Sequence, residues 1–240
     1  MATTTNFEGG SFGRKFSISR ENGTENKEGV PHFFEWIKEI PQEKGNRKFE
    51  TRKGKDGNFR NYELFRAIDG HLIDIEVQTK DFSGKPEEWL VLKLADGEED
   101  YQIELGQIDG RYSMDTMKRL LDPSFNPNQK VRLSPYALKN DSGSWNIGVS
   151  IMNGTDTKLS AKRESEWLTD IPEATKIVFK GETQYDFTPI ANWLIQKVGK
   201  EVLPKLKKDP ISAPSNAKQV EIPQESVPRQ EPTEDDPLPF

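Results

Sequence analysis

The chain has 240 residues, no cysteine, two histidines and a formal net charge of −6. This length suits one substantial domain with a tail, and the lack of cysteine excludes disulfides, thiolate metal sites and cysteine nucleophiles. Because no apolar run reaches about 18 residues and the start, MATTTNFEGGSFG, lacks the pattern of a signal peptide, we expect a soluble, cytoplasmic protein.

Short segments rich in β-branched and aromatic residues begin near residue 47 and predict β-strands. The first two, NRKFETR and NFRNYELFR, flank KGKDG, in which Asp56-Gly57 is a turn signal, so they should form a long hairpin. The next strand is expected in HLIDIEVQ, with Ile73, Ile75 and Val77 on one face, and EWLVLKL and YQIEL should follow as strands.

A helix is predicted over about residues 112–121, because apolar side chains recur there at helical spacing. These side chains are Met114, Met117, Leu120 and Leu121. KVRLSPYAL and WNIGVSIM flank KNDSG and predict a second hairpin, and KIVFK predicts a further strand. A last helix is expected from about Pro189, and Pro204 should distort or end it.

Residues 209–240 have a different composition from the rest of the chain. They hold 7 of its 16 prolines and show neither a helical nor an alternating apolar period. Seven acids against Lys218 and Arg229 give this segment a charge of −5, which leaves −6 − (−5) = −1 for residues 1–208. The sequence therefore predicts a disordered, proline-rich, acidic tail.

For residues 1–208, meandering antiparallel strands with one inserted helix favour a mainly β fold. We expect an OB-type antiparallel barrel with extra hairpins, the inserted helix and the C-terminal helix, in which residues 1–13 are flexible. The same pattern of strands also allows an open sheet or a sandwich.

The predicted first hairpin, residues 44–66, combines positive charge with aromatic rings. Eight lysines and arginines against three acids give it a charge of +5. Cations bind phosphates and flat rings stack on unpaired bases of any sequence, so this pattern suits single-stranded nucleic acid. The residues assigned to this contact are Arg47, Lys48, Phe49, Arg52, Lys53, Lys55, Phe59, Arg60, Tyr62 and Arg66. The alternative is a solvated sheet edge whose phenylalanines belong to the core.

Other candidate sites are weaker. Asp74 and Glu76 form a D-x-E pair on a predicted strand, which suits a metal-dependent nuclease but is more often the solvated face of a half-buried strand. His32 is expected to pack or to lie at the surface, and His71, on the apolar face with Ile73, is expected to be a satisfied core group and not a ligand. We therefore expect no metal, no cofactor and no enzymatic activity.

The sequence ends in TEDDPLPF, a composition that suits a docking peptide. An apolar pocket of a partner would accept Phe240, and basic groups around that pocket would bind the neighbouring carboxylates. The residues assigned to this contact are Asp235, Asp236, Leu238, Pro239 and Phe240. The alternative is a tail that only increases solubility.

This ending resembles the acidic tip of bacterial-type single-stranded DNA-binding proteins, which is typically Asp-Asp-Asp-Ile-Pro-Phe. Asp235, Asp236, Pro239 and Phe240 match it, Leu238 replaces the isoleucine, and Pro237 stands where the family has a third aspartate. The resemblance is confined to the tip and to the acidic linker before it. Together with the hairpin, it suggests a divergent, phage-encoded member of this family.

The resemblance implies sequence-independent binding and protection of single-stranded DNA in replication, recombination and repair, within a bacterial cell or phage-infected host. The tip would recruit proteins of these pathways. An alternative is an adaptor or inhibitor that engages a replication protein through the tip without binding nucleic acid. A nuclease that uses Asp74 and Glu76 is the third candidate.

Overall fold

The computed structural model describes residues 13–20, 31–54, 56–82, 84–97, 99–162, 166–179 and 182–206. The predicted flexible start falls outside this set apart from Gly13, and the predicted tail falls outside it entirely. Strands dominate the described residues, as the sequence predicts.

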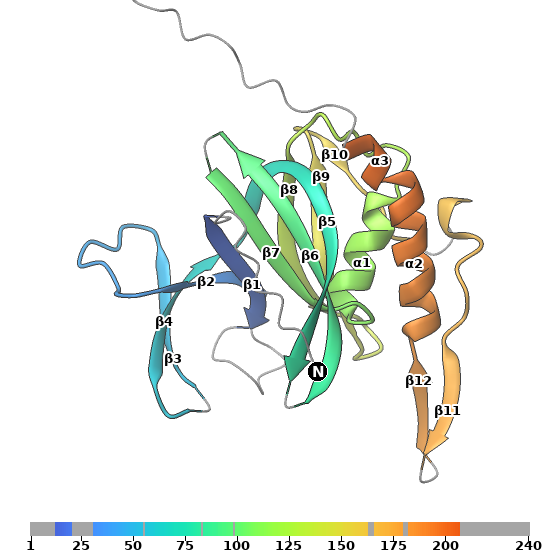
Figure 1. Ribbon diagram of the computed structural model, residues 1–240, viewed down its shortest axis with the longest axis horizontal. Coiled ribbons are helices and arrows are strands. Elements are labelled where there is room, and N and C mark those ends of the chain that lie inside the picture. Colours follow the sequence, from blue (N-terminus) through green and yellow to red (C-terminus); the bar gives the residue numbers. More distant parts are fainter. Residues whose placement is uncertain are drawn as a thin grey trace, which may run out of the picture.

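Ten strands form one sheet, with the order β10-β9-β8-β5-β6-β7-β1-β2-β4-β3 (Figure 1). Their bounds are β1 (Arg14–Arg20), β2 (Pro31–Ile37), β3 (Lys48–Lys53), β4 (Phe59–Phe65), β5 (Ile68–Phe82), β6 (Lys85–Asp96), β7 (Glu99–Gln107), β8 (Val131–Lys139), β9 (Trp145–Asn153) and β10 (Thr157–Lys158). Neighbouring strands are antiparallel except β1 and β7, which are parallel. The sheet is therefore mixed.

The expected closed, wholly antiparallel barrel is not found. The sheet curls enough to bring β2 near β8, but the strand order has two ends and does not close. The reason lies in β1, a strand that the sequence analysis did not predict. It pairs in parallel with the edge of β7, with Phe16 opposite Ile103. Strands β2, β4 and β3 then continue the sheet beyond β1 instead of closing it.

Both predicted hairpins of the sheet are confirmed, because β3 pairs with β4 and β8 pairs with β9. The expectation for the strand over Ile73–Val77 is partly wrong. A bulge between Leu72 and Asp74 shifts the alternation. Leu72 and Ile75 are consequently buried, whereas Ile73 is half-buried and Val77 is exposed.

Helix α1 (Arg111–Leu120) lies against the sheet, on β9 and β7, and helix α2 (Thr188–Glu201) lies beside α1 (Figure 1). Both match the predicted helices closely. Their apolar stripes enter the same core as the sheet, where Met117 and Leu194 pack in one cluster with Leu92 of β6. The turn α3 (Leu203–Leu206) follows α2 after a break at Val202, next to Pro204.

A second, two-stranded sheet consists of β11 (Thr175–Phe179) and β12 (Glu182–Asp186). The first of these strands is the predicted KIVFK segment. A short 3-10 helix, η1 (Glu166–Leu168), precedes it. Among the described residues, no helix is long and apolar enough to cross a membrane.

Candidate nucleic-acid interface

The β3–β4 hairpin carries most of the residues predicted to contact nucleic acid. Its register places Lys53 opposite Phe59 at the tip and Lys48 opposite Leu64 at the base. Gly57 makes the turn with φ of 81°, a conformation that glycine adopts without steric cost. Asp56 stabilises the turn, because its Oδ1 accepts a hydrogen bond from the Asn58 backbone N–H at 3.2 Å. Lys55 lies outside the described residues.

Each acid of this hairpin is held by an arginine of the same hairpin. Arg47, which directly precedes β3, donates from Nε to Oε1 of Glu63 on β4 at 2.5 Å. The other two pairs are Arg52 Nη2 with Glu50 Oε2 at 2.8 Å and Arg60 Nη2 with Asp56 Oδ2 at 2.6 Å.

These three pairs show which bases of the hairpin are bound to its own acids. Besides these three arginines the hairpin contains the bases Lys44, Lys48, Lys53, Lys55 and Arg66, and its net charge is +5. All four of these that the structure describes are exposed. Arg47, Arg52 and Arg60 therefore hold carboxylates, and most of the other bases of the hairpin are lysines.

The aromatic rings of the hairpin occupy different environments. Phe59, at the tip, is 72% exposed. Tyr62 is half-buried and packs edge-on against Phe34 of β2, with ring centroids 5.2 Å apart. Phe49 is also half-buried, and Arg47 lies 5.2 Å from its ring centroid. Of the three rings assigned from the sequence, Phe59 is the one most accessible to a base.

A further exposed ring comes from β2, where the sequence analysis placed no site residue. Trp36 is 61% exposed and lies opposite Tyr62 in the β2–β4 register. The sequence carries a signal for it, since alternation in HFFEW puts Phe34 and Trp36 on one face and Phe33 on the other. Phe33 is indeed fully buried.

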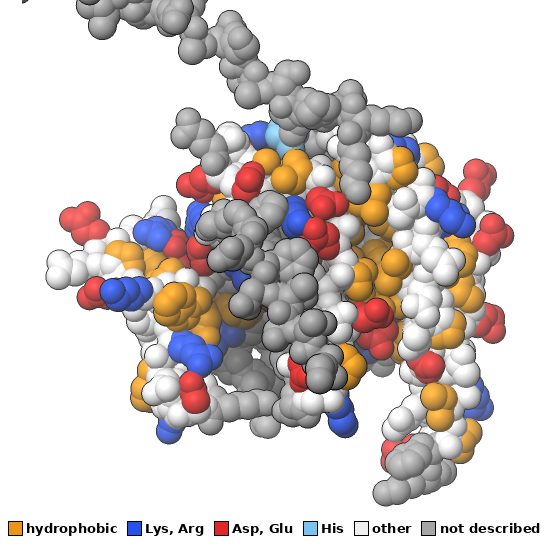
Figure 2. Space-filling view, viewed as in Figure 1, with side chains coloured by type: hydrophobic (Ala, Val, Ile, Leu, Met, Phe, Trp, Pro, Cys, Tyr) orange, Lys and Arg blue, Asp and Glu red, His pale blue; other side chains and the backbone are white. Residues whose placement is uncertain are grey.

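Basic and acidic side chains are interspersed with hydrophobic ones over β2, β4 and β3, at one end of the molecule (Figure 2). Next to this region, a hollow of about 350 Å³ lies between β1 and β2. Its lining residues are Gly13, Lys15, Ser17, Phe34, Glu35 and Trp36.

One buried carboxylate, that of Glu104 on β7, neighbours this hollow. Lys15 forms an ion pair with it, Lys80 Nζ lies 2.7 Å from Oε1, and the hydroxyl of Ser17 donates to Oε2 at 3.2 Å. Burial alone would raise the pKa of Glu104, but the two lysines outweigh burial and hold the pKa below its usual value. Glu104 is therefore ionised and ties β7 to β1 and β5.

Asp74 and Glu76, the residues of the nuclease alternative, share a lysine. Lys93 of β6 forms an ion pair with Glu76 and lies 3.7 Å from Asp74 Oδ2. Burial opposes ionisation of Glu76, yet the hydrogen bonds from Lys93 and Gln78 lower its pKa overall. Among the described residues, no group of three or more His, Cys, Asp or Glu side chains is arranged to hold a metal.

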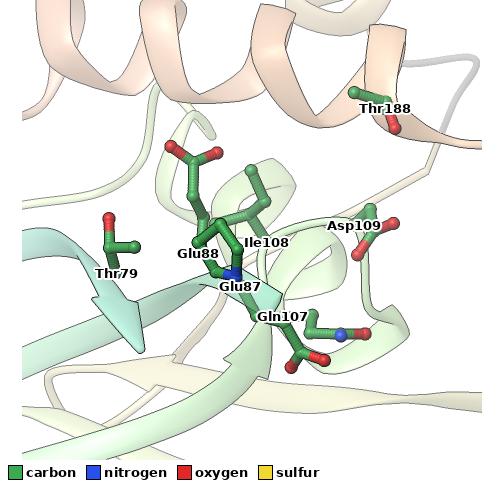
Figure 3. Close-up of a pocket in the computed structure, with 8 residues that line it drawn as sticks. Thr79, Glu87, Glu88, Gln107, Ile108, Asp109 and Thr188 are labelled. Carbon is green, nitrogen blue, oxygen red and sulfur yellow. The ribbon is translucent and has the colours of Figure 1, made fainter. Parts of the chain in front are cut away.

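A second hollow, of about 460 Å³, opens at the start of α2, where Glu87, Glu88 and Asp109 contribute carboxylates to its lining (Figure 3). The rest of its lining consists of Thr79, Pro86, Gln107, Ile108 and Thr188. Three carboxylates repel phosphate, so this hollow does not suit a nucleic-acid strand.

Comparison of the chain with protein-family models, with curated proteins and with solved structures finds no match. The tip residues Asp235, Asp236, Leu238, Pro239 and Phe240 lie outside the described residues. Function is therefore inferred from the interface on β1–β4 and from the sequence of the tip.

Proposed function

We propose that this protein binds single-stranded DNA without sequence preference, through the β3–β4 hairpin and the neighbouring face of β2. The observation that carries the proposal is the position of Phe59 and Trp36, which are the two most exposed aromatic side chains among the described residues. Phe59 lies opposite the exposed Lys53 at the hairpin tip, and Trp36 lines a hollow together with the exposed Lys15. A single strand needs rings for its bases as well as cations for its phosphates.

The relationship to the OB fold belongs to this proposal. Strands β5, β6 and β7 form a meander, α1 follows, and β8 and β9 return to the other side of β5. This order resembles a five-stranded OB fold, and OB folds bind oligonucleotides on their second and third strands. Here those strands are β6 and β7, and β1 and β2 extend their face toward Trp36.

The C-terminal tip belongs to the proposal as the site that recruits replication, recombination or repair proteins. Its support is the sequence of the last residues, in which Asp235, Asp236, Pro239 and Phe240 match the family's tip. The alternative function is an adaptor that uses the tip without binding nucleic acid. That function does not explain why Phe59 and Trp36 are exposed beside lysines.

The test is a titration of fluorescent oligo-dT and of a matched duplex with the full chain, in a salt series with and without magnesium. If about four to six phosphates are neutralised, log K should fall with log salt at a slope of about −3 to −4, and duplex should bind far more weakly. Equal affinity for duplex, or an affinity independent of salt, contradicts the proposal. Absence of binding favours the adaptor, and magnesium-dependent cleavage favours the nuclease.

A further inference from the structure

The hollow between β1 and β2 lies on the same face of the sheet as Tyr62. Residues paired across neighbouring strands share a face, so the pairs Trp36–Tyr62 and Phe34–Ser17 place Trp36 and Phe34 on one side. Lys15 lies two residues before Ser17 on β1 and therefore on that side too. The hollow consequently continues the face of the hairpin that bears Tyr62 toward β7, whereas alternation along β4 turns Phe59 to the opposite face.

The hollow offers both groups that a nucleotide needs. The exposed indole ring of Trp36 forms one wall, and the ammonium group of Lys15, whose side chain is 57% exposed, lies in the same lining. Its volume of about 350 Å³ is in the range of small-ligand sites, which is about 300–1,000 Å³. Glu35, the acid in the lining, is bound by Arg14 Nη2 at 2.6 Å, which offsets its repulsion of a phosphate.

Lys15 is able to change partners at low cost. Its carboxylate partner, Glu104, is also held by Lys80 at 2.7 Å, so Glu104 keeps one cation when Lys15 turns to a phosphate. Removing the sole partner of a buried charge is strongly destabilising, and the second lysine avoids that penalty.

We propose that this hollow binds one unstacked nucleotide of a single-stranded DNA, with the base on Trp36 and the adjoining phosphate at Lys15. This subsite rests on the proposed function, since it needs a bound single strand. It adds a contact outside the β3–β4 hairpin and sets the direction of the strand from the Tyr62 face of the hairpin, across β2, toward β1.

The test compares oligo-dT binding by the full chain and by its Trp36→Ala, Trp36→Phe and Lys15→Gln variants. Trp36→Ala should weaken binding about fivefold to about 150-fold, and Trp36→Phe should retain much of the affinity because it keeps a ring. Lys15→Gln should reduce the salt slope by about 0.7, the value of one phosphate contact to a single strand. Tyr185→Ala is the matched control, because Tyr185 is 57% exposed on β12, in the other sheet, and should bind as wild type.

A crosslinking experiment separates a direct contact from a structural effect. Irradiated oligonucleotides that carry 5-iododeoxyuridine should attach to the peptide that contains Trp36, as identified by mass spectrometry. Wild-type affinity in Trp36→Ala, with crosslinks confined to other peptides, overturns the subsite while the proposed function stands. Failure of the wild-type chain to bind oligo-dT overturns the proposed function itself.

Discussion

Arginines and lysines of the β3–β4 hairpin have different surroundings. Arg47 and Arg52 hold Glu63 and Glu50, and their guanidinium groups also lie over aromatic rings. A planar guanidinium suits such fixed contacts, whereas the flexible ammonium group of an exposed lysine suits a mobile phosphate. Truncation of Arg47 would leave the carboxylate of Glu63 buried without its partner. We therefore expect the arginines to maintain the hairpin and the lysines to attract DNA.

The rings of Phe59 and Tyr62 should respond differently to alanine substitution. Phe59→Ala should weaken oligo-dT binding by about 1–3 kcal/mol with an unchanged melting temperature, because its ring is exposed and available for stacking. Tyr62→Ala should lower the melting temperature, because its ring packs on Phe34 and lies under Arg52 at 5.4 Å. Anisotropy titration and thermal unfolding of both variants measure these effects. Wild-type stability and wild-type affinity in both variants would show that the site is misassigned.

The sequence alone predicts the β3–β4 hairpin of the candidate site, but it does not predict which side chains of the site contact each other. Phe59 follows a turn signal, so its place near a hairpin tip was predictable. The pairing of Arg47 with Glu63 depends on strand register, and the meeting of Lys15 with Trp36 depends on a β1–β2 pairing across residues distant in sequence. Alternation shows which side chains of a strand share a face, and a turn sets the register of its own hairpin, but neither names a partner strand elsewhere in the chain.

At the scale of elements, locally formed structure was predictable and the long-range pairing was not. Both hairpins and helix α1 depend on turn signals and periodicity within short windows. The parallel pairing of β1 with β7 joins Phe16 to Ile103, and no local pattern specifies such a partner. Because this pairing prevents the curled sheet from closing, the prediction of a closed barrel was wrong.

Helix α1 is fixed to the β8–β9 hairpin by a half-buried polar cluster. Asp115 Oδ2 accepts hydrogen bonds from Arg119 Nε and from the Val149 backbone N–H, each at 2.9 Å. Arg119 Nη2 donates to the Tyr136 hydroxyl at 3.2 Å, and burial raises the pKa of that phenol. The close approach of helix and hairpin requires a residue without a side chain at position 148.

Gly148→Ala should therefore destabilise the protein by about 1–3 kcal/mol, as expected for overpacking of a filled site. An added Cβ would lie 2.2 Å from Asp115 Oδ2 and 2.7 Å from the Tyr136 hydroxyl, distances that force both to move. Urea unfolding should show a lower midpoint with an unchanged m-value.

Gly199→Ala is the control for this substitution. Gly199 lies within helix α2, and no atom comes within 4 Å of an added Cβ. Alanine there should stabilise the protein by about 0.5–1 kcal/mol through helix propensity. A wild-type midpoint for Gly148→Ala would show that Asp115 and Tyr136 move aside with no change in the free energy of unfolding. The cluster would then not fix α1 to the sheet.

At the scale of the whole molecule, charge is divided between two segments. Residues 209–240 carry −5 and residues 44–66 carry +5, within a chain of −6. A tethered segment has a high effective concentration at any site that it can reach. Carboxylates of the tail and phosphates of DNA are attracted by the same exposed lysines, so we expect the tail to compete with DNA for the hairpin.

Removal of residues 209–240 should therefore raise the affinity for oligo-dT several-fold at low salt. The gain should shrink toward physiological ionic strength, where the Debye length falls to about 8 Å and the attraction between tail and hairpin is screened. Removal of Phe240 alone is the control, because it leaves the seven acids of the segment in place and should leave DNA affinity nearly unchanged. Titration of oligo-dT at several salt concentrations with the full chain, the chain without residues 209–240 and the chain without Phe240 measures both effects. Weaker DNA binding after tail removal would mean that the tail contributes to the bound state, and the competition mechanism would then be rejected.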